Sequence, residues 1–330
     1  MTKRTRVFLF ASAGVVVAGL ATGLVAWASA QAAAGSAGPD ELAYVPASAR
    51  MVAYADVRQV MSSPFRDRVR QYQRGNPSGA DSIEARTGID LERDIDRVLF
   101  ASTAALNPSP TLEGPGRSLV IARGRFDGVR IEGVMRQQGA EVTEYRGKRL
   151  VSIKDDTHDA ALSFAEPGLV LFGALDNVRG ALDARAGAAD RITSNREFMA
   201  LVSGVDDGTA WSVAKFDSLS GAAIPPGVMS QLPPINWLAA SGRIDSGLHG
   251  LVRAEARDEQ SAQNLRDVVQ GFLALARLQG GREPAYKGML DSVALAADGK
   301  SVSLSFDVTP AALDMLTPRG GAGQRRPGGP

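Results

Sequence analysis

The sequence has 330 residues, of which 37 are lysine or arginine and 36 are aspartate or glutamate, and it has no cysteine. The balanced charge argues against a nucleic-acid-binding protein, which normally carries a strongly basic domain. The lack of cysteine excludes disulfides, thiolate catalysis, cysteine-based zinc sites and an acylated lipoprotein cysteine. Apolar residues make up 44% of the chain, which allows a sizeable core in one large domain or two small ones.

The N-terminal 30 residues have the features of an export segment. The chain begins with a short basic stretch, formed by Lys3, Arg4 and Arg6. Residues 7–30 then carry no charge, and Ala28 and Ala30 place small side chains where signal peptidase cleaves. Cleavage at this point makes Gln31 the first residue of the mature chain.

Two interpretations of residues 1–30 remain open, a cleaved signal peptide and a retained N-terminal membrane anchor. The uncharged run is about as long as the roughly 20 residues of a membrane-spanning helix, whereas a signal core has roughly 7–15. Glycines within the run lower its hydrophobicity and favour the signal peptide. Both interpretations place the rest of the chain outside the cytoplasm, either in the periplasm or attached to the inner membrane, which would then be a partner of this segment.

The composition of the chain changes near both ends of its apolar part. Residues 31–40 are rich in alanine, glycine and serine and are typical of a flexible linker. Residues 318–330 are mostly glycine, proline and arginine, which predicts a disordered tail because such a segment buries no apolar surface. Between them we predict two halves, at residues 41–190 and 191–317.

Strands joined by tight turns are predicted through both halves. Ser301–Val308 alternates strictly between apolar and polar residues, which indicates a half-buried strand of an antiparallel sheet. Asp298-Gly299 before it is typical of a hairpin with a type I′ turn. Further turns are expected at Arg146-Gly147, Glu166-Pro167-Gly168 and Asp245-Ser246-Gly247.

Three helices are predicted from their capping residues. The first begins near Pro64, and the second begins after Asp127. The third begins after Asp258 and ends at Gly280-Gly281. Its apolar face consists of Ala262, Leu265, Val269, Phe272 and Ala276. Such a face should pack against a sheet.

These elements predict an α+β fold, with an antiparallel sheet and helices packed on one of its faces. The two halves share an order of elements. Each opens with a strand, at Val52–Val57 and Ala210–Phe216, and each has a later strand that leads into a helix capped by aspartate. An internal duplication and an unrelated pair of halves both remain open.

The sequence offers few candidates for catalysis or metal binding. His158 lies among acidic residues, but a metal site needs ligands from several elements and no second cluster accompanies it. His249 also stands alone in the sequence. Ser212 and Lys215 have the S-x-x-K spacing of penicillin-recognising enzymes, in which the motif opens a helix, whereas here the segment alternates like a strand. We therefore expect no catalytic residue, no metal and no cofactor.

Two groups of charged residues are kept as weak candidates. Arg66, Arg70 and Arg74 recur every four residues, a spacing that lines one face of a helix and can bind an anionic surface. The acidic residues that follow them also fit simple neutralisation on a solvated face. Asp56 ends a predicted strand, where a carboxylate can act in a cleft, although its simpler role is to cap the following helix.

Five stretches of the sequence resemble a group of exported bacterial proteins of uncharacterised function. They are Tyr44–Ala47, Met51–Val57, Thr87–Asp96, Arg253–Asp258 and Asn264–Val269, and they include a Val-Pro-Ala lead before a Val-Ala-Tyr-Ala-Asp-Val strand. The resemblance covers most of residues 41–316. It implies export and a shared α+β fold, and it carries over no catalytic residue and no substrate.

Together these features predict an exported, non-enzymatic envelope protein that binds a partner protein or another envelope component. The alternative is a periplasmic carrier of a small molecule or lipid, which would need an apolar cavity. A hydrolase is the third possibility, because paired carboxylates leave no fixed signature in a sequence.

Overall fold

The fold was obtained as a computed structural model. It describes residues 39–63, 66, 89–90, 92–103, 118–154, 159–219, 232–244, 247–280 and 284–309. The predicted export segment at 1–30 and tail at 318–330 lie outside these residues, as does nearly all of the predicted linker. Of the helices that the structure describes, none is both long enough and apolar enough to cross a membrane.

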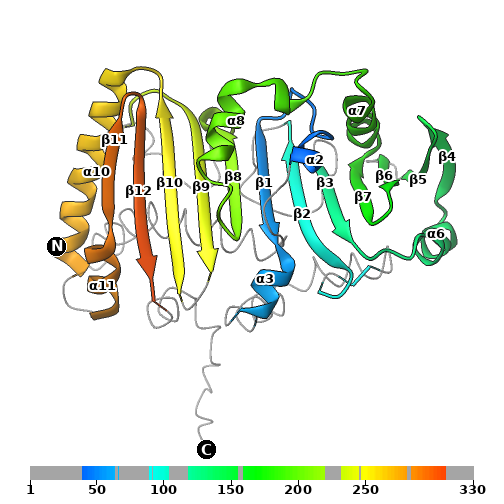
Figure 1. Cartoon of the computed structure of the whole chain (residues 1–330), viewed down its shortest axis with the longest axis horizontal. Coiled ribbons are helices and arrows are strands. Elements are labelled where there is room, and N and C mark those ends of the chain that lie inside the picture. Colours follow the sequence, from blue (N-terminus) through cyan, green and yellow to red (C-terminus); the bar gives the residue numbers. More distant parts are fainter. Residues whose placement is uncertain are drawn as a thin grey trace, which may run out of the picture.

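The described strands form one antiparallel sheet (Figure 1). Its twelve strands lie in the order β11-β12-β10-β9-β8-β1-β2-β3-β7-β6-β5-β4. In the first half of the chain they are β1 (Met51–Asp56), β2 (Ile95–Ser102), β3 (Ser118–Gly124), β4 (Glu141–Tyr145), β5 (Lys148–Lys154), β6 (Asp159–Glu166) and β7 (Leu169–Ala174). In the second half they are β8 (Ala210–Lys215), β9 (Ile235–Ile244), β10 (Leu248–Ala256), β11 (Ala294–Asp298) and β12 (Ser301–Val308).

The described helices connect these strands. The α-helices are α2 (Pro39–Leu42), α3 (Val57–Ser62), α6 (Gly128–Gln137), α7 (Leu175–Ala186), α8 (Arg196–Ser203), α10 (Glu259–Gly280) and α11 (Pro284–Ser292). Two short 3-10 helices are η2 (Ile192–Ser194) and η3 (Phe216–Leu219). This content confirms the predicted α+β class.

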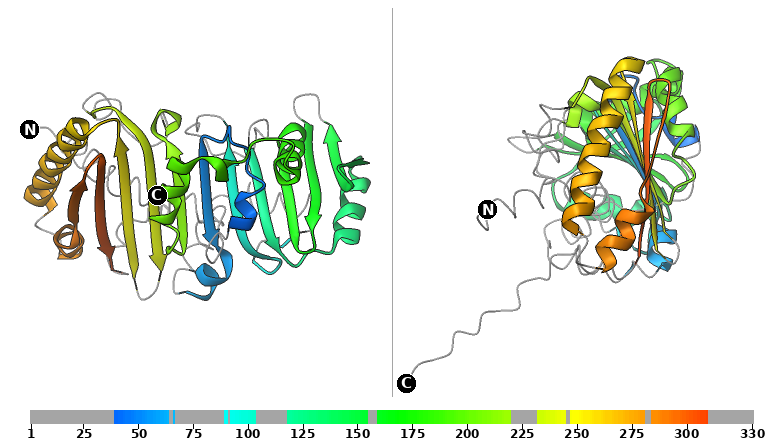
Figure 2. Two further views of the ribbon diagram at one scale, coloured as in Figure 1. Left: turned by 45° about the horizontal axis from the view of Figure 1, so that its top comes forward. Right: turned by 90° about the vertical axis from the view of Figure 1, so that its left-hand side faces the viewer.

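The prediction that the helices pack on one face of the sheet is not confirmed. Ala262 and Leu265 of α10 pack with Ala254 of β10 and Val302 of β12. The end-on view shows α10 on one side of the sheet and α2, α7 and α8 on the other (Figure 2). The central strands need cover on both sides because they are apolar on both: Val52 and Ala53, neighbours on β1 that face opposite ways, are 0% and 2% exposed.

The predicted alternation of β12 is confirmed. Val302, Phe306 and Val308 are buried on the side of α10, whereas Ser305 and Asp307 are exposed on the opposite side. The ring of Phe306 lies over Gly250 of β10, so close that a Cβ at that glycine would fall 2.2 Å from the ring. Glycine at this position therefore makes room for a large aromatic side chain.

Two of the predicted hairpin turns differ in type. Tyr145 pairs with Lys148, and the intervening Arg146 and Gly147 have φ of 52° and 70°, as a type I′ turn requires. The hairpin of β11 and β12 was predicted as type I′ at Asp298-Gly299, and this was wrong. Asp298 pairs with Ser301, so the loop is Gly299-Lys300, and only Gly299 has a positive φ, at 54°. Glycine at the first loop position fits a type II′ turn.

Two of the predicted helices begin directly after the aspartate residues that were predicted to cap them. The Asp127 carboxylate accepts a hydrogen bond from the Arg130 amide at 3.0 Å, and the Asp258 carboxylate accepts one from the Ser261 amide at 2.8 Å. Asp56 caps α3, as the simpler of its two predicted roles required. The helix predicted near Pro64 falls outside the described residues.

The predicted halves meet at the middle of the sheet. Their opening strands, β1 and β8, pair antiparallel with each other, and Tyr54 lies opposite Trp211. In each half the third strand then pairs with the last strand of that half, β3 with β7 and β10 with β12. This order is the one that a duplicated chain would give, and the duplication itself stays a prediction.

Replacing Phe306 with aspartate tests the facing of β12. We expect a loss of more than about 3 kcal/mol in the free energy of unfolding, because a buried ring is removed and an unpaired charge is buried. The matched change Ser303→Asp, on the other face and opposite Arg253, should alter stability by less than about 0.5 kcal/mol. Urea unfolding followed by circular dichroism measures both, and equal losses would contradict the assigned facing.

Candidate functional site

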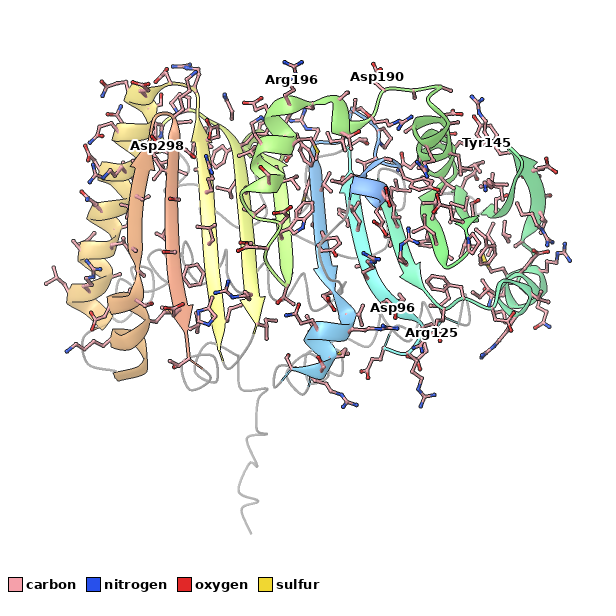
Figure 3. The ribbon with its side chains drawn as sticks, viewed as in Figure 1. Asp96, Arg125, Tyr145, Asp190, Arg196 and Asp298 are labelled. Carbon is pink, nitrogen blue, oxygen red and sulfur yellow. The ribbon has the colours of Figure 1, made fainter. Side chains whose placement is uncertain are left out.

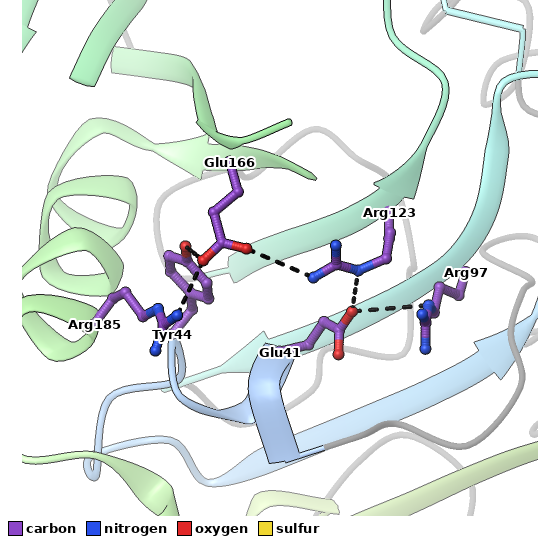
Figure 4. Close-up of polar contacts among 6 residues, drawn as sticks. All are labelled: Glu41, Tyr44, Arg97, Arg123, Glu166 and Arg185. Atoms are coloured by element: carbon purple, nitrogen blue, oxygen red, sulfur yellow. Dashed lines mark hydrogen bonds and ion pairs between the residues drawn. The ribbon is translucent and has the colours of Figure 1, made fainter. Parts of the chain in front are cut away.

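Six polar side chains converge where α2 lies against the sheet (Figure 4). We call this cluster the α2 network: Glu41, Tyr44, Arg97, Arg123, Glu166 and Arg185. Its members come from α2 and the turn after it, from strands β2, β3 and β6, and from helix α7. They are therefore distant in sequence and are brought together only by the complete sheet.

The two carboxylates of the α2 network are each contacted by two arginines. Glu41 accepts a hydrogen bond from Arg123 and lies 3.7 Å from Arg97 Nε. Glu166 Oε1 lies 3.1 Å from Arg185 Nη2, and its Oε2 lies 3.8 Å from Arg123 Nη2. Arg123 thus bridges the two carboxylates, and each arginine of the network faces a carboxylate.

Glu41 is the most deeply buried charged residue of the network, at 4% exposure. A buried carboxylate is costly unless ion pairs and hydrogen bonds compensate for the lost hydration. Arg97 and Arg123 supply that compensation from two neighbouring strands. The four-residue helix α2 is far too short to be stable by itself, so this contact fastens it to the sheet.

Tyr44 joins the network from the turn after α2. Its hydroxyl donates a hydrogen bond to Glu166 Oε1 at 2.9 Å. Burial and then the neighbouring Glu166 raise the pKa of Tyr44 to about 12, so the hydroxyl keeps its proton. Burial alone would raise the pKa of Glu166, but the hydrogen bonds from Tyr44 and Arg185 outweigh it and lower that pKa.

The backbone after α2 is also held in place. The Ala47 amide donates to the Asp190 carbonyl at 2.9 Å, and the Ile192 amide donates to the Val45 carbonyl at 2.8 Å. Pro46 and Arg191 form an isolated antiparallel bridge. The segment that follows the predicted linker is therefore fixed by backbone hydrogen bonds as well as by charge.

Asp56 lies at the end of β1, opposite Arg97 of β2. Its side chain accepts a hydrogen bond from the Gln59 amide, which caps α3. Burial raises the pKa of Asp56 to about 6, against the lowering effect of that hydrogen bond and of Arg97. A carboxyl with such a pKa can exchange a proton near neutrality, but here its acceptor oxygen is engaged by the helix start.

Two buried hydrogen-bond donors lie side by side near Asp56. The rings of Tyr54 and Trp211 stack at 5.4 Å, and both residues are almost fully buried. The Tyr54 hydroxyl and the Trp211 Nε1 make no hydrogen bond of good geometry with the described residues. They belong to the main apolar cluster, in which their rings contribute packing.

The structure separates the other residues that the sequence singled out. Ser212 and Lys215 lie in β8, and their odd spacing puts them on opposite faces, so they form no nucleophile pair. The Lys215 ammonium lies instead 5.4 Å from the centre of the Trp237 ring. His249, alone in the sequence, has its Nδ1 2.5 Å from Asp307 Oδ1 across the β10–β12 pair.

The described part of the chain does not show the three arginines that were predicted as a weak anionic-surface site lying together. Arg66 is exposed and its amide donates to the Ser63 carbonyl at 3.1 Å, whereas Arg70 and Arg74 lie outside the described residues. The cleavage-site residues Ala28, Ala30 and Gln31 also lie outside them, as does His158.

Comparisons with known proteins give no family and no close relative. No family model matches the chain, and no curated protein matches it. Among solved structures, crystal forms III and I of TP0453 are similar, each at 11% sequence identity. Form III has a TM-score of 0.47 and covers 83% of this chain and 96% of that one, and form I has a TM-score of 0.46 and covers 84% and 96%.

Replacing Glu41 with glutamine tests whether the α2 network stabilises the fold. We expect a loss of about 2–4 kcal/mol in the free energy of unfolding, less than for a fully buried pair because the arginines reach solvent. The same change at Glu141, exposed on β4, is the matched control and should have almost no effect. Urea unfolding measures both variants, and indistinguishable curves would contradict the assigned role.

Replacing Asp56 with asparagine should give a gain in stability that grows with pH. The folded protein holds the Asp56 proton up to a pKa of about 6, whereas an unfolded aspartate releases it near about 3.9. Stability contributed by this group therefore falls as pH rises between these values. Asparagine keeps the cap without ionising.

We expect equal melting temperatures for wild type and Asp56→Asn at pH 4 and a higher one for the variant at pH 7. The same substitution at Asp127, an exposed helix cap, should lack this gain. Thermal unfolding across this pH range measures both. A variant that is less stable than wild type at pH 7 would show that the ionised carboxylate stabilises the fold.

Proposed function

We propose that the chain is an exported envelope protein without a catalytic role, and that its folded part binds a partner protein. The observation that supports this most strongly is a broad, uncovered area of the sheet. In Figure 1 no described helix lies in front of β11 and β12, whereas α2, α7 and α8 lie in front of other strands. Helix α8 reaches as far as β9, where Phe198 contacts the Trp237 ring edge-on. The support for export is the basic start and the uncharged run of residues 7–30.

We call this area the open polar face, and it is formed by alternate residues of three strands. Its polar members are Arg243 on β9, His249, Arg253 and Glu255 on β10, and Ser303, Ser305 and Asp307 on β12. Towards β8 this side of the sheet becomes apolar, where Leu251 is partly buried and Trp237 and Ala239 are buried in the main apolar cluster. Positive and negative side chains alternate across it. Arg253 donates a hydrogen bond to the Ser301 hydroxyl at 2.6 Å, and His249 pairs with Asp307, so several of these side chains are held in place.

The chemistry of the open polar face fits a protein better than other partners. Nucleic acids and anionic membranes select surfaces with an excess of positive charge, whereas this face mixes both signs. Small molecules are usually enclosed in concave, mostly apolar pockets, whereas this face follows the surface of a sheet and carries short serine side chains. Interspersed charges and hydrogen-bonding groups suit the complementary surface of another protein.

A photo-reactive amino acid placed at Ser305 in the producing bacterium tests this proposal. We expect an adduct between the full chain and another protein, identified by mass spectrometry. The matched control is Gln263, which is exposed on α10 on the other side of the sheet and should give no such adduct. The variant Ser305→Arg should then lose the cellular partner while its melting temperature stays unchanged.

Two outcomes would contradict the proposal. Equal adducts at Ser305 and Gln263 would show that the open polar face is not a selective surface. A lipid or metabolite that co-purifies with the native protein in near-stoichiometric amount would favour a carrier instead.

A further inference from the structure

The two edges of the sheet differ in how well they are protected against pairing with another strand. Natural edge strands avoid such pairing by carrying charges, prolines or bulges. The edge strand β4 carries Glu141 and Glu144, both exposed. The edge strand β11 has the sequence Ala-Leu-Ala-Ala-Asp, with its one charge at the end.

The outer side of β11 is accessible. Among the described strands β11 pairs with β12 alone, and Ala294, Ala296 and Ala297 are exposed. Helix α10 packs on one face of the sheet and stands to the side of the β11–β12 hairpin in the end-on view (Figure 2). Figure 3 labels Asp298, the last residue of this strand.

We propose that β11 pairs antiparallel with β11 of a second copy of this chain, which joins the two sheets into one. Residues directly opposite each other in an antiparallel pair lie on the same face of the sheet. In a symmetric pair of identical strands, even-numbered residues must therefore lie opposite even-numbered residues, and odd-numbered opposite odd-numbered. The register centred on Ala296 does so. It sets Ala296 opposite itself at the two-fold axis and Ala294 opposite Asp298, so no like charges face each other.

Charge complementarity in this register favours a second copy over an unrelated strand. Lys300, exposed in the turn after β11, then lies at the same end of the strand pair as Ser292 of the second copy, which precedes that copy's β11. Asp291, exposed at the end of α11, is the residue next to that serine. Two-fold symmetry forms this contact between lysine and aspartate twice, once at each end of the strand pair.

The pairing has a consequence for the open polar face, because β11 borders it. Antiparallel edge pairing about a two-fold axis perpendicular to the sheet leaves the same face of both copies on one side. The open polar faces of the two copies would then form one continuous surface. The pairing itself does not depend on what that surface binds.

Sedimentation velocity of the full chain, over a hundredfold range of concentration, tests the proposal. We expect wild type to shift from monomer to dimer as concentration rises. Ala296→Lys places two lysines opposite each other at the axis and should weaken the dimer at least about tenfold. The matched control is Thr143→Lys on the other edge strand, which is also exposed and should leave the dimer unchanged.

A charge-swap mixture tests the register itself. Ala296→Lys and Ala296→Glu should each be monomeric at concentrations where wild type is dimeric, and their equimolar mixture should form a heterodimer. A wild type that stays monomeric throughout would overturn the proposal, as would a dimer that persists in Ala296→Lys. A mixture that forms no heterodimer would also overturn it. Far-UV circular dichroism of each variant confirms that Ala296, being exposed, tolerates the change.

These outcomes are separate from those of the photo-crosslinking experiment. An adduct at Ser305 with another copy of this chain has the mass of two chains, whereas an adduct with a different protein does not. The dimer can therefore fail while the partner-binding proposal stands, and the reverse also holds.

Discussion

The pairing of β1 with both β2 and β8 is the constraint on which the rest of this structure depends. It joins the strands of the two halves into one sheet. A strand in this position is covered on both faces, and Val52, Ala53 and Tyr54 are at most 2% exposed. A chain without cysteine has no disulfide to hold two halves together, so the sheet and its packing must do so. The apolar residues of β1 supply that packing on both sides.

The α2 network places the start of the folded chain relative to this central strand. Arg97 lies on β2 opposite Asp56, the last residue of β1, and it also faces Glu41 of α2. The charge pairs thus fix α2 against the strands next to β1. Whether residues 1–30 are cleaved or retained, the chain enters the fold at this point, and the ion pairs resist its displacement.

The sequence predicted those features that depend on neighbours along the chain. The alternation of β12, the caps at Asp127 and Asp258 and the capping role of Asp56 are all local, and all are confirmed. The type of turn was harder to predict, because Asp298-Gly299 indicates a hairpin but not which two residues form its loop. A short helix was expected after the hairpins of the first half, but the start of α7 could not be predicted because Ala174, the residue before it, makes no capping hydrogen bond.

The α2 network was beyond reach of the sequence for a physical reason. Glu41 and Arg123 are 82 residues apart, and Tyr44 and Glu166 are 122 residues apart, so no spacing connects them. The same network explains why β2 was missed. Its start, Ile95-Asp96-Arg97, carries charges that are typical of a surface loop, whereas in the fold Arg97 neutralises a buried carboxylate and Asp96 pairs with Arg58 at 2.7 Å. The charges at the start of this interior strand therefore predicted a solvent-exposed segment instead of a strand.

The helices cover some strands of the sheet and leave others open, and this difference supports the proposed location of partner binding. Strands β1 to β3 are covered on both faces where their residues are apolar, and the fold needs that cover for its core. Strand β12 is apolar towards α10 and polar on the other side, and β10 follows it except at Leu251, which is partly buried against the main apolar cluster. Stability therefore requires nothing to cover the polar part of this side. A surface that the fold leaves open, with ordered charges of both signs, is free to bind another protein at little cost to stability. The outer edge of β11 adjoins it, which places both proposed contacts at the same end of the molecule.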